Sequence, residues 1–352
     1  MKIAMLLPTL DKKGPIIVAK NIANGLLKSS KISNVKVFYF DDTKDTLTFN
    51  CDLEKLDFLK IYDFSDFDIV HSHTLRTDFY LLMSSFLPCN ANVKFVTTIH
   101  QYNYDSFYYK YNSTIVAHVI SSAWSLILSR HDLVVCLSKH MQNYYQNRMK
   151  NKNIEFVYNG CEILNSKESV IDNKILSFKA KYFIIGVACS LIKRKGLEQI
   201  IKSMPHLPNV AFVILGDGPE KSNLENLSLE LGVNDRVYFK GFVDDVPQYY
   251  KTFDLFVFPS RSEGFGLALI EAAAMKIPIA CSRIPSFIEL FDDSEVGFFE
   301  LDNIQSIVET INQVNSSREV YIKNSYSKYM KSYHVDKMVD FYIEKYLILN
   351  GV

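Results

Sequence analysis

Two acidic residues occupy one stretch of unusual composition, SRSEGFGLALIEAAAMKIPIACS, at residues 260–282. Seven residues separate Glu263 from Glu271, and Gly264 and Gly266 lie between them. Glycine has no Cβ and lets a backbone pass close to a ligand. Two carboxylates beside a glycine turn therefore indicate a site that binds hydroxyl groups or phosphate.

A helix of small residues is predicted to begin at Gly266 or Leu267 and to end before Pro278. Its N-terminal end carries a partial positive charge that favours phosphate. Glu271, about one turn inside this helix, can accept two hydrogen bonds from a ribose diol. Glu263 can hold a sugar hydroxyl or balance a developing positive charge. The alternative is a helix-capping acid beside a solvated acid.

Two further loops have compositions that suit phosphate. KRKG at 193–196 places three cations at a predicted helix entrance, where backbone N–H groups are exposed, and this combination suits a pyrophosphate. GDGP at 216–219 is a glycine turn with proline at a predicted helix start. Taken alone, each loop is more typical of an ordinary solvated turn. The position of KRKG directly after a predicted strand favours the phosphate interpretation.

These loops follow strands that must be covered on both faces. The predicted strands are continuous β-branched and aromatic runs, a pattern typical of parallel sheets. Helix-like segments, among them 14–29 and 218–232, separate most of them. The sequence thus predicts two successive α/β arrays of doubly wound, Rossmann-like character. The predicted strands are 2–8, 35–40, 68–73, 93–100, 132–138 and 154–160, then 182–190, 210–218, 236–242, 254–260, 277–282 and 296–301.

The two arrays and the residues that follow them predict two domains and a C-terminal helix. Residues 1–160 form an N-terminal acceptor-binding domain, and residues 161–330 form a C-terminal nucleotide-sugar-binding domain. Residues 331–352 form a helix that packs back on the N-terminal domain. The polar stretch 163–174 is predicted to be a linker with a surface helix.

Polar residues gather where the predicted strands end. Ligands of doubly wound sheets bind beyond the carboxyl ends of the strands. Because both arrays carry such loops, we expect two sheets facing each other across a cleft. The residues at these ends are Gly14, His71, His73, His100 and Ser138 in the first array, and 193–196, 216–218, Gly241 and 260–266 in the second.

The composition narrows the class of protein. Of 352 residues, 48% are hydrophobic and 22% are charged, which indicates a globular chain with large cores. The formal net charge is zero, which argues against a nucleic-acid partner. The six cysteines form no C-x-x-C pair, so we expect reduced thiols in a cytoplasmic protein. Neither a signal peptide nor a transmembrane segment is predicted.

EGFGLALIE resembles the E-x7-E motif of retaining glycosyltransferases of family 4, which have the GT-B fold of two Rossmann-like domains. The likeness includes KRKGLEQII and LGDGPEKSNLENL and covers residues 155–300. It is looser in the first half, where DIVHSH, TTIH and CLSKHM occupy the expected places. Three places depart from the family: Pro15 follows Gly14, Ser190 stands where an arginine is common, and no glycine pair precedes Glu289.

The resemblance implies a role for each matching residue. It makes His100, Lys195 and Glu263 the candidate catalytic residues: His100 near the reacting carbon, Lys195 at the departing diphosphate, and Glu263 at the donor sugar. Glu271 would bind the nucleotide ribose, and Arg194 would assist Lys195. The remaining candidates for donor binding are Gly14, Ser190, Gly216, Gly218, Phe242, Gly264, Phe265, Gly266 and Leu267.

The resemblance also implies a reaction. A hexose or N-acetylhexosamine would pass from a nucleotide-sugar, a UDP-sugar, to a lipid-linked glycan in lipopolysaccharide or capsule assembly. The anomeric configuration would be retained, with neither metal nor cofactor. The alternatives are a nucleotide-sugar epimerase or phosphorylase on the same fold, and a non-catalytic sugar-nucleotide-binding protein. A dinucleotide oxidoreductase is disfavoured, because no G-x-G-x-x-G follows the first predicted strand.

The acceptor side is encoded less clearly. Residues 102–128 combine many tyrosines, Trp124 and an apolar helix. Aromatic side chains with a polar tip favour membrane interfaces, which predicts peripheral contact with the cytoplasmic face of a membrane. Ordinary packing within the protein explains the same composition equally well.

Overall fold

The computed structural model describes residues 1–44, 46–150, 153–162, 172–243 and 245–351. It divides into two compact units, Met1–Cys161 with Tyr333–Val352, and Glu162–Ser332. Each unit holds one sheet, and every strand pairing that builds the sheets is parallel, as the continuous apolar runs predict. The linker predicted over 163–174 falls mostly outside the described residues.

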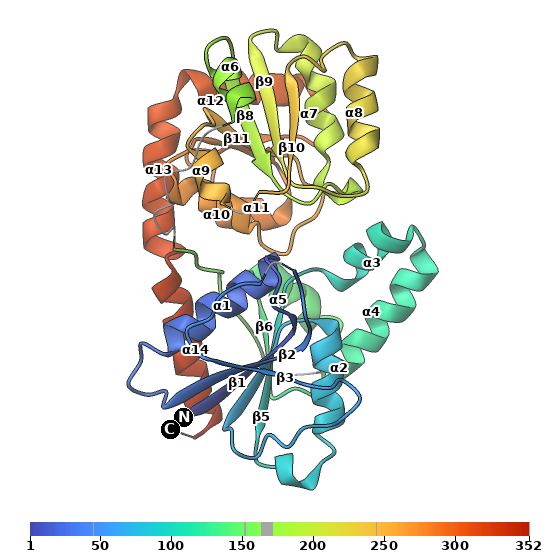
Figure 1. Ribbon diagram of the computed structural model, residues 1–352, viewed down its shortest axis with the longest axis vertical. Helices are drawn as coiled ribbons and strands as arrows, with labels where there is room; N and C mark the ends of the chain where they lie inside the picture. The colour runs from blue at the N-terminus through green and yellow to red at the C-terminus, as the bar shows by residue number, and fades with distance from the viewer. Residues whose placement is uncertain (45, 151–152, 163–171, 244, 352) are drawn as a thin grey trace. The chain divides into compact units, whose positions relative to one another are not determined.

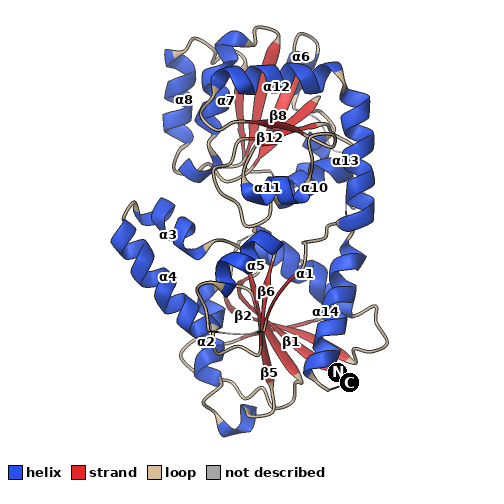
Figure 2. Ribbon diagram, turned by 180° about the vertical axis from the view of Figure 1, so that it is seen from behind, coloured by secondary structure: helices blue, strands red, loops and turns tan. Residues whose placement is uncertain are grey.

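The first unit is a doubly wound sheet with the strand order β3-β2-β1-β4-β5-β6-β7 (Figures 1 and 2). The order reverses between β1 and β4, which makes this the switch point of the sheet. Its strands are β1 (Lys2–Thr9), β2 (Asn34–Asp41), β3 (Asp52–Lys55), β4 (Ile69–Ser72), β5 (Lys94–Ile99), β6 (Leu133–Cys136) and β7 (Ile154–Phe156). Its helices are α1 (Gly14–Leu26), α2 (Leu75–Ser84), η1 (Pro88–Asn90), α3 (Asn103–Tyr111), α4 (Thr114–Leu128), α5 (Lys139–Gln146) and α14 (Val335–Leu349).

Strand β3 is not among the predicted strands. Its sequence DLEK is short and polar, and most of its residues are exposed at the edge of the sheet. Burial on both faces produces the apolar runs by which the other strands are recognised. An edge strand with four residues carries no such signal.

The second unit repeats the same winding, with the strand order β10-β9-β8-β11-β12-β13 and a switch point between β8 and β11 (Figures 1 and 2). Its strands are β8 (Phe183–Ala188), β9 (Val210–Leu215), β10 (Val237–Gly241), β11 (Leu255–Phe258), β12 (Ile279–Ser282) and β13 (Gly297–Phe299). Its helices are α6 (Asn173–Lys179), η2 (Lys193–Lys195), α7 (Leu197–Ser203), η3 (Met204–His206), α8 (Lys221–Glu230), α9 (Val246–Tyr250), α10 (Leu267–Ala274), α11 (Pro285–Leu290), α12 (Ile304–Ser316) and α13 (Arg318–Ser332).

The C-terminal helix α14 packs within the first unit. Gly25 of α1 permits the close contact, because a Cβ at Gly25 would lie 2.3 Å from Val339 Cγ2 of α14. Tyr342 and Tyr346 are fully buried against the sheet. Helix α13 belongs to the second unit, so the chain changes unit between Ser332 and Tyr333.

Helices α3 and α4 pack together as a hairpin that extends beyond the sheet of the first unit (Figures 1 and 2). Helix α4 coincides with the apolar stretch 114–128, and Ser113 caps it by accepting a hydrogen bond from the Val116 N–H. Within the described parts of the chain, no helix combines the length and apolar character needed to cross a membrane. All six cysteines are free thiols.

Candidate functional site

Two loops meet at the switch point of the second unit, one following β8 and the other following β11. Gly196, with φ +63°, lies so close to Pro259 that a Cβ would be 2.3 Å from its carbonyl oxygen. The Arg261 N–H donates to Arg194 O at 2.8 Å, and Gln199 Nε2 donates to Pro259 O at 3.0 Å. These contacts, two of them between backbone atoms and one from the Gln199 side chain, fix the KRKG loop against the SRSEG loop.

Glu263 is the centre of this junction and is 8% exposed. Its Oε1 accepts hydrogen bonds from Lys195 Nζ at 2.5 Å and Ser260 Oγ at 2.7 Å. Arg194 lies 3.4 Å from the other carboxylate oxygen, and Lys195 Nζ also lies 4.9 Å above the Phe258 ring. The candidate catalytic residues Lys195 and Glu263 therefore form one contact, joined by Arg194.

The ion pairs decide the charge state of Glu263. Burial alone raises the pKa of a carboxyl, but the positive charges of Lys195 and Arg194, with the hydrogen bonds from Lys195 and Ser260, bring the pKa of Glu263 below its ordinary value. The carboxylate is thus ionised at neutral pH. With two cations against one anion, the cluster keeps an excess positive charge, and such a charge attracts an anion.

Helix α10 begins directly beside this cluster. Gly266 is its N-cap at φ +107°, and a Cβ there would lie 2.7 Å from the Phe287 ring. Glycine has no side chain with which to cap the helix, so the N–H groups of the first turn of α10 are not used by the N-cap residue. Gly264 and Phe265 are buried in the preceding turn, and Leu267 is partly exposed.

Glu271 lies on α10 and differs from Glu263 in its environment. Tyr250 Oη lies 3.5 Å from its Oε2. Burial raises the pKa of the Glu271 carboxyl to about 7, and the hydrogen bond from Tyr250 offsets only part of that rise. Glu271 therefore titrates near neutral pH and gains from ligand groups that donate hydrogen bonds to its ionised form.

The GDGP turn follows β9 and contacts the loop after β8. A Cβ at Gly216 would lie 2.0 Å from Cys189 O, and one at Gly218 would lie 2.4 Å from Leu191 O. The close packing of the two loops therefore explains by itself why both positions are glycine. Ser190 is exposed in the loop that they contact, and Phe242 beyond β10 is 57% exposed.

The first unit places its candidate residues at the same kind of edge. Gly14 is exposed and begins α1, with Pro15 in the first turn. His100 follows β5, and its Nε2 lies 3.0 Å from Nδ1 of His73, which follows β4. The sequence shows that several histidines end neighbouring strands, but only the structure shows that two of them share a hydrogen bond.

A buried polar group that the sequence analysis missed surrounds Asp78 of α2. Its carboxylate accepts hydrogen bonds from Ser72 Oγ at 2.6 Å, Thr97 Oγ1 at 2.6 Å and Trp124 Nε1 at 2.8 Å. Trp124 is 3% exposed. Within residues 102–128, Trp124 therefore packs in the interior, because its polar tip bonds a buried carboxylate instead of facing outward.

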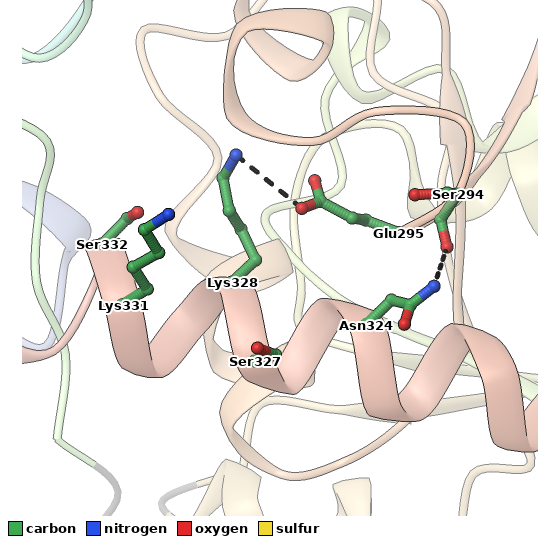
Figure 3. Close-up of a pocket in the computed structure, with 7 residues that line it drawn as sticks. All are labelled: Ser294, Glu295, Asn324, Ser327, Lys328, Lys331 and Ser332. Atoms are coloured by element: carbon green, nitrogen blue, oxygen red, sulfur yellow. Dashed lines mark hydrogen bonds and ion pairs between the residues drawn. The ribbon is translucent and has the colours of Figure 1, made fainter.

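A surface hollow of about 360 Å³ lies between the loop after α11 and helix α13 (Figure 3). Lys328 Nζ lies 3.7 Å from Glu295 Oε1 across it, and Asn324 Nδ2 donates to Ser294 O at 2.8 Å. None of the candidate catalytic or donor-binding residues lines this hollow.

The opposite pKa shifts of the two glutamates predict opposite responses to pH. Glu263→Gln leaves Lys195 with a weaker partner and should lower the free energy of unfolding at pH 7 by roughly 3 kcal/mol. This cost should shrink as the pH falls below 4.5, because a carboxyl with a lowered pKa stabilises the fold only while it is ionised.

Glu271→Gln is the matched control with the reverse sign. When folding raises the pKa of a carboxyl from 4.5 to about 7, the folded protein becomes less stable as the pH rises through that interval. The free energy of unfolding of the variant should therefore be higher than that of the wild type at about pH 8, by up to about 3 kcal/mol. The two proteins should be equally stable at about pH 4. Denaturant unfolding across this pH range measures the stability of each variant against that of the wild type. Parallel pH profiles for the two variants would contradict the environments assigned to Glu263 and Glu271.

Comparisons with solved structures show the fold. Anabaena HepE, solved in complex with UDP and glucose, superposes with a TM-score of 0.81 at 18% identity over 98% of this chain and 99% of HepE. Sucrose-phosphate synthase from Thermosynechococcus elongatus gives a TM-score of 0.80 at 16% identity over 100% of both chains.

Sequence comparisons show the family. Residues 170–332 match the model for glycosyl transferases group 1, and residues 46–163 match the model for glycosyltransferase family 4. The O-antigen biosynthesis glycosyltransferase WclY of Escherichia coli is 30% identical over 330 residues, which cover 90% of each chain. An Escherichia coli enzyme named UDP-Gal:alpha-D-GlcNAc-diphosphoundecaprenol alpha-1,3-galactosyltransferase is 26% identical over 79% of this chain and 76% of its own. With two parallel-sheet α/β units and these matches in both, the chain belongs to the glycosyltransferases of group 1 and family 4, on the GT-B fold.

Proposed function

We propose that this glycosyltransferase moves a hexose or N-acetylhexosamine from a UDP-sugar to a lipid-linked oligosaccharide in surface polysaccharide assembly, with retention of the anomeric configuration. The observation that carries the proposal is the excess positive charge of Lys195, Arg194 and Glu263 at the start of α10. The printed names of relatives support the substrates: one acts with UDP-Gal on a diphosphoundecaprenol-linked sugar, and WclY acts in O-antigen biosynthesis.

The chemistry places the largest demand on the diphosphate. As the bond from the anomeric carbon to the phosphate oxygen breaks, its electron pair passes to the diphosphate, which gains negative charge. Lys195 and Arg194 stabilise that charge without reorganising, because contacts to Glu263 already hold them in place. The acceptor hydroxyl bonds the anomeric carbon on the same face, and its proton passes to the departing phosphate.

The carboxylates have separate tasks in this proposal. Glu271 accepts hydrogen bonds from the ribose hydroxyls, which favour its ionised form and replace the hydration that burial removes. Glu263 orients Lys195 and faces the sugar, where its negative charge offsets the oxocarbenium-like transition state. His100 hydrogen-bonds a sugar of the substrate. The two fixed cations supply the charge that a metal ion provides in other transferases, so the reaction proceeds without one.

Incubation with a panel of nucleotide-sugars, with and without a lipid-linked acceptor, tests this function. Transfer should require the acceptor, favour UDP-sugars, preserve the anomeric configuration and survive excess chelator. Conversion of the nucleotide-sugar without an acceptor would instead indicate an epimerase, and release of a sugar phosphate would indicate a phosphorylase. Binding without any turnover would indicate a non-catalytic protein, and rescue by magnesium after chelation would refute the metal-independent mechanism.

Lys195→Ala should lower kcat by roughly 10²–10³-fold, because its ammonium meets charge that grows in the transition state. The donor KM should change less. Lys193→Ala is the matched control, since Lys193 is exposed, lies two residues away and carries the same charge. Steady-state kinetics of both variants measure this difference, and melting temperatures confirm that both are folded. Equal effects of the two substitutions, or a change in KM alone for Lys195→Ala, would contradict the assignment.

The enzyme is proposed to work at the cytoplasmic face of the membrane that holds its lipid-linked acceptor. The α3–α4 hairpin supports this location, because several of its apolar or aromatic side chains are exposed: Tyr108, Tyr111, Ile115, Val116 and Val119. Ile115 and Val119 are four residues apart on α4 and therefore share one face of the helix. Exposed apolar side chains on one face suit a binding surface, and tyrosine side chains suit the lipid–water interface.

Replacing Ile115 and Val119, which are 75% and 64% exposed, by Asp should weaken binding to anionic lipid vesicles at least tenfold. Transfer to a water-soluble acceptor analogue should persist, because the hairpin is separate in sequence from the charged cluster. Val320→Asp is the control, since Val320 is 57% exposed on helix α13 of the other unit. Vesicle sedimentation that gives the same loss for both variants, or none for the hairpin variant, would exclude this surface.

A further inference from the structure

His73 and His100 form a hydrogen-bonded pair at the edge of the first sheet. His73 Nδ1 lies 3.0 Å from His100 Nε2, and the two rings are tilted by 32° with centroids 5.3 Å apart. His73 is 1% exposed, whereas His100 is partly exposed. One histidine therefore belongs to the interior and holds the other at the surface.

The interior histidine is itself held in place. The His71 ring packs against the His73 ring, with centroids 4.3 Å apart and the planes tilted by 34°. His71 in turn bonds Tyr346 Oη through Nδ1 at 2.7 Å and Thr98 Oγ1 through Nε2 at 2.8 Å. Tyr342 Oη lies 2.8 Å from the same threonine hydroxyl. Strands β4 and β5 and helix α14 thus fix the ring plane of His73.

All three imidazoles are neutral at physiological pH. Burial lowers the pKa of His71 and of His100 to about 3, and burial with the neighbouring histidines brings the pKa of His73 well below its usual range. In a bond between two neutral imidazoles, one nitrogen carries the hydrogen and the other offers a lone pair. The direction of the bond consequently fixes the tautomers of both rings.

The unused nitrogens indicate that direction. His73 Nε2 is buried without a hydrogen-bond partner among the described residues. If His100 Nε2 donated, His73 would have to carry its hydrogen on that buried Nε2, and orphaned buried N–H groups are rarer than under-satisfied acceptors. If His73 Nδ1 donates, the second hydrogen of the pair is on His100 Nδ1. The described residues provide no partner for this nitrogen, which is not one of the buried unpartnered atoms.

We propose that His73 is a positioning residue: its Nδ1–H donates to His100 Nε2, which fixes His100 as the Nδ1–H tautomer and presents that N–H as a hydrogen-bond donor to a sugar oxygen of the substrate. The inference rests on the proposed function, because His100 is a substrate contact only there. A neutral donor suits a transition state with positive charge on the sugar, which an imidazolium would oppose. His73 supplies the geometry, and the partly exposed His100 makes the contact.

Nitrogen-15 NMR of the ligand-free protein tests the tautomer directly, with His100→Gln used only to assign the signals. The expected spectrum shows a protonated Nδ1 and an unprotonated Nε2 for His100, unchanged between about pH 6 and pH 8. A protonated Nε2 on His100, or an imidazolium in this range, overturns the inference. This measurement does not depend on turnover, so it separates failure of the inference from failure of the proposed function.

His73→Leu and His73→Asn then separate positioning from packing. Leucine fills the space without a hydrogen-bond donor, whereas the asparagine amide can donate from near the Nδ1 position. In the transfer assay, leucine should lower kcat on the order of 10–100-fold, and asparagine should recover most of it. The leucine variant should also show both His100 tautomers by NMR. Equal kinetics for the wild type and His73→Leu, or equal losses of kcat in the two folded variants, would refute a positioning role. If His73→Leu does not fold, the kinetics of His73→Asn and the NMR spectrum of the wild type decide the question.

Discussion

The ion cluster around Glu263 is the contact on which the site of the second unit depends. Its carboxylate joins the loop after β8 to the loop after β11 through Lys195 and Arg194, at the switch point of the sheet. Without Glu263, two adjacent cations would repel each other in a mostly buried place. With it, they are held 3.4 Å or less from a shared anion and still leave an excess charge for a ligand.

The backbone around the cluster explains why glycine recurs there. Gly196 lies against Pro259, and Gly266 lies against Phe287, both with positive φ. A side chain at either place would separate the loops that bring Lys195 to Glu263 and would move the start of α10. The glycines of the motif thus allow the loops to pack closely, and the charged residues of the motif form the ion cluster. The cluster depends on the close packing as well as on the charges.

The sequence predicts the second unit better than the first for a physical reason. Both parallel sheets follow from apolar runs. The sequence places Lys195 and Glu263 in polar loops after predicted strands, but only the structure shows that β8 and β11 are neighbours and that the two side chains form a contact. The pair of His73 and His100 depends on the register of β4 against β5, which apolar periodicity does not specify. The hydrogen bond from Trp124 to Asp78 joins residues 46 apart, and nothing local in the sequence indicates it.

The Glu263 cluster of the second unit and the His73–His100 pair of the first unit differ in charge, and the proposed reaction uses both. Salt bridges in the second unit keep charges ionised, because Glu263 has Lys195 and Arg194 as partners. Burial keeps His73 and His100 of the first unit neutral, and among the residues that the structure describes no cation or anion forms an ion pair with either imidazole. A leaving diphosphate is stabilised by fixed positive charge, whereas a positively charged imidazole beside a sugar that becomes cationic would oppose the reaction. The difference between ionised and neutral groups therefore follows from the partners that surround each group, and under the proposed function it suits the Glu263 cluster to the phosphate and His100 to a sugar oxygen.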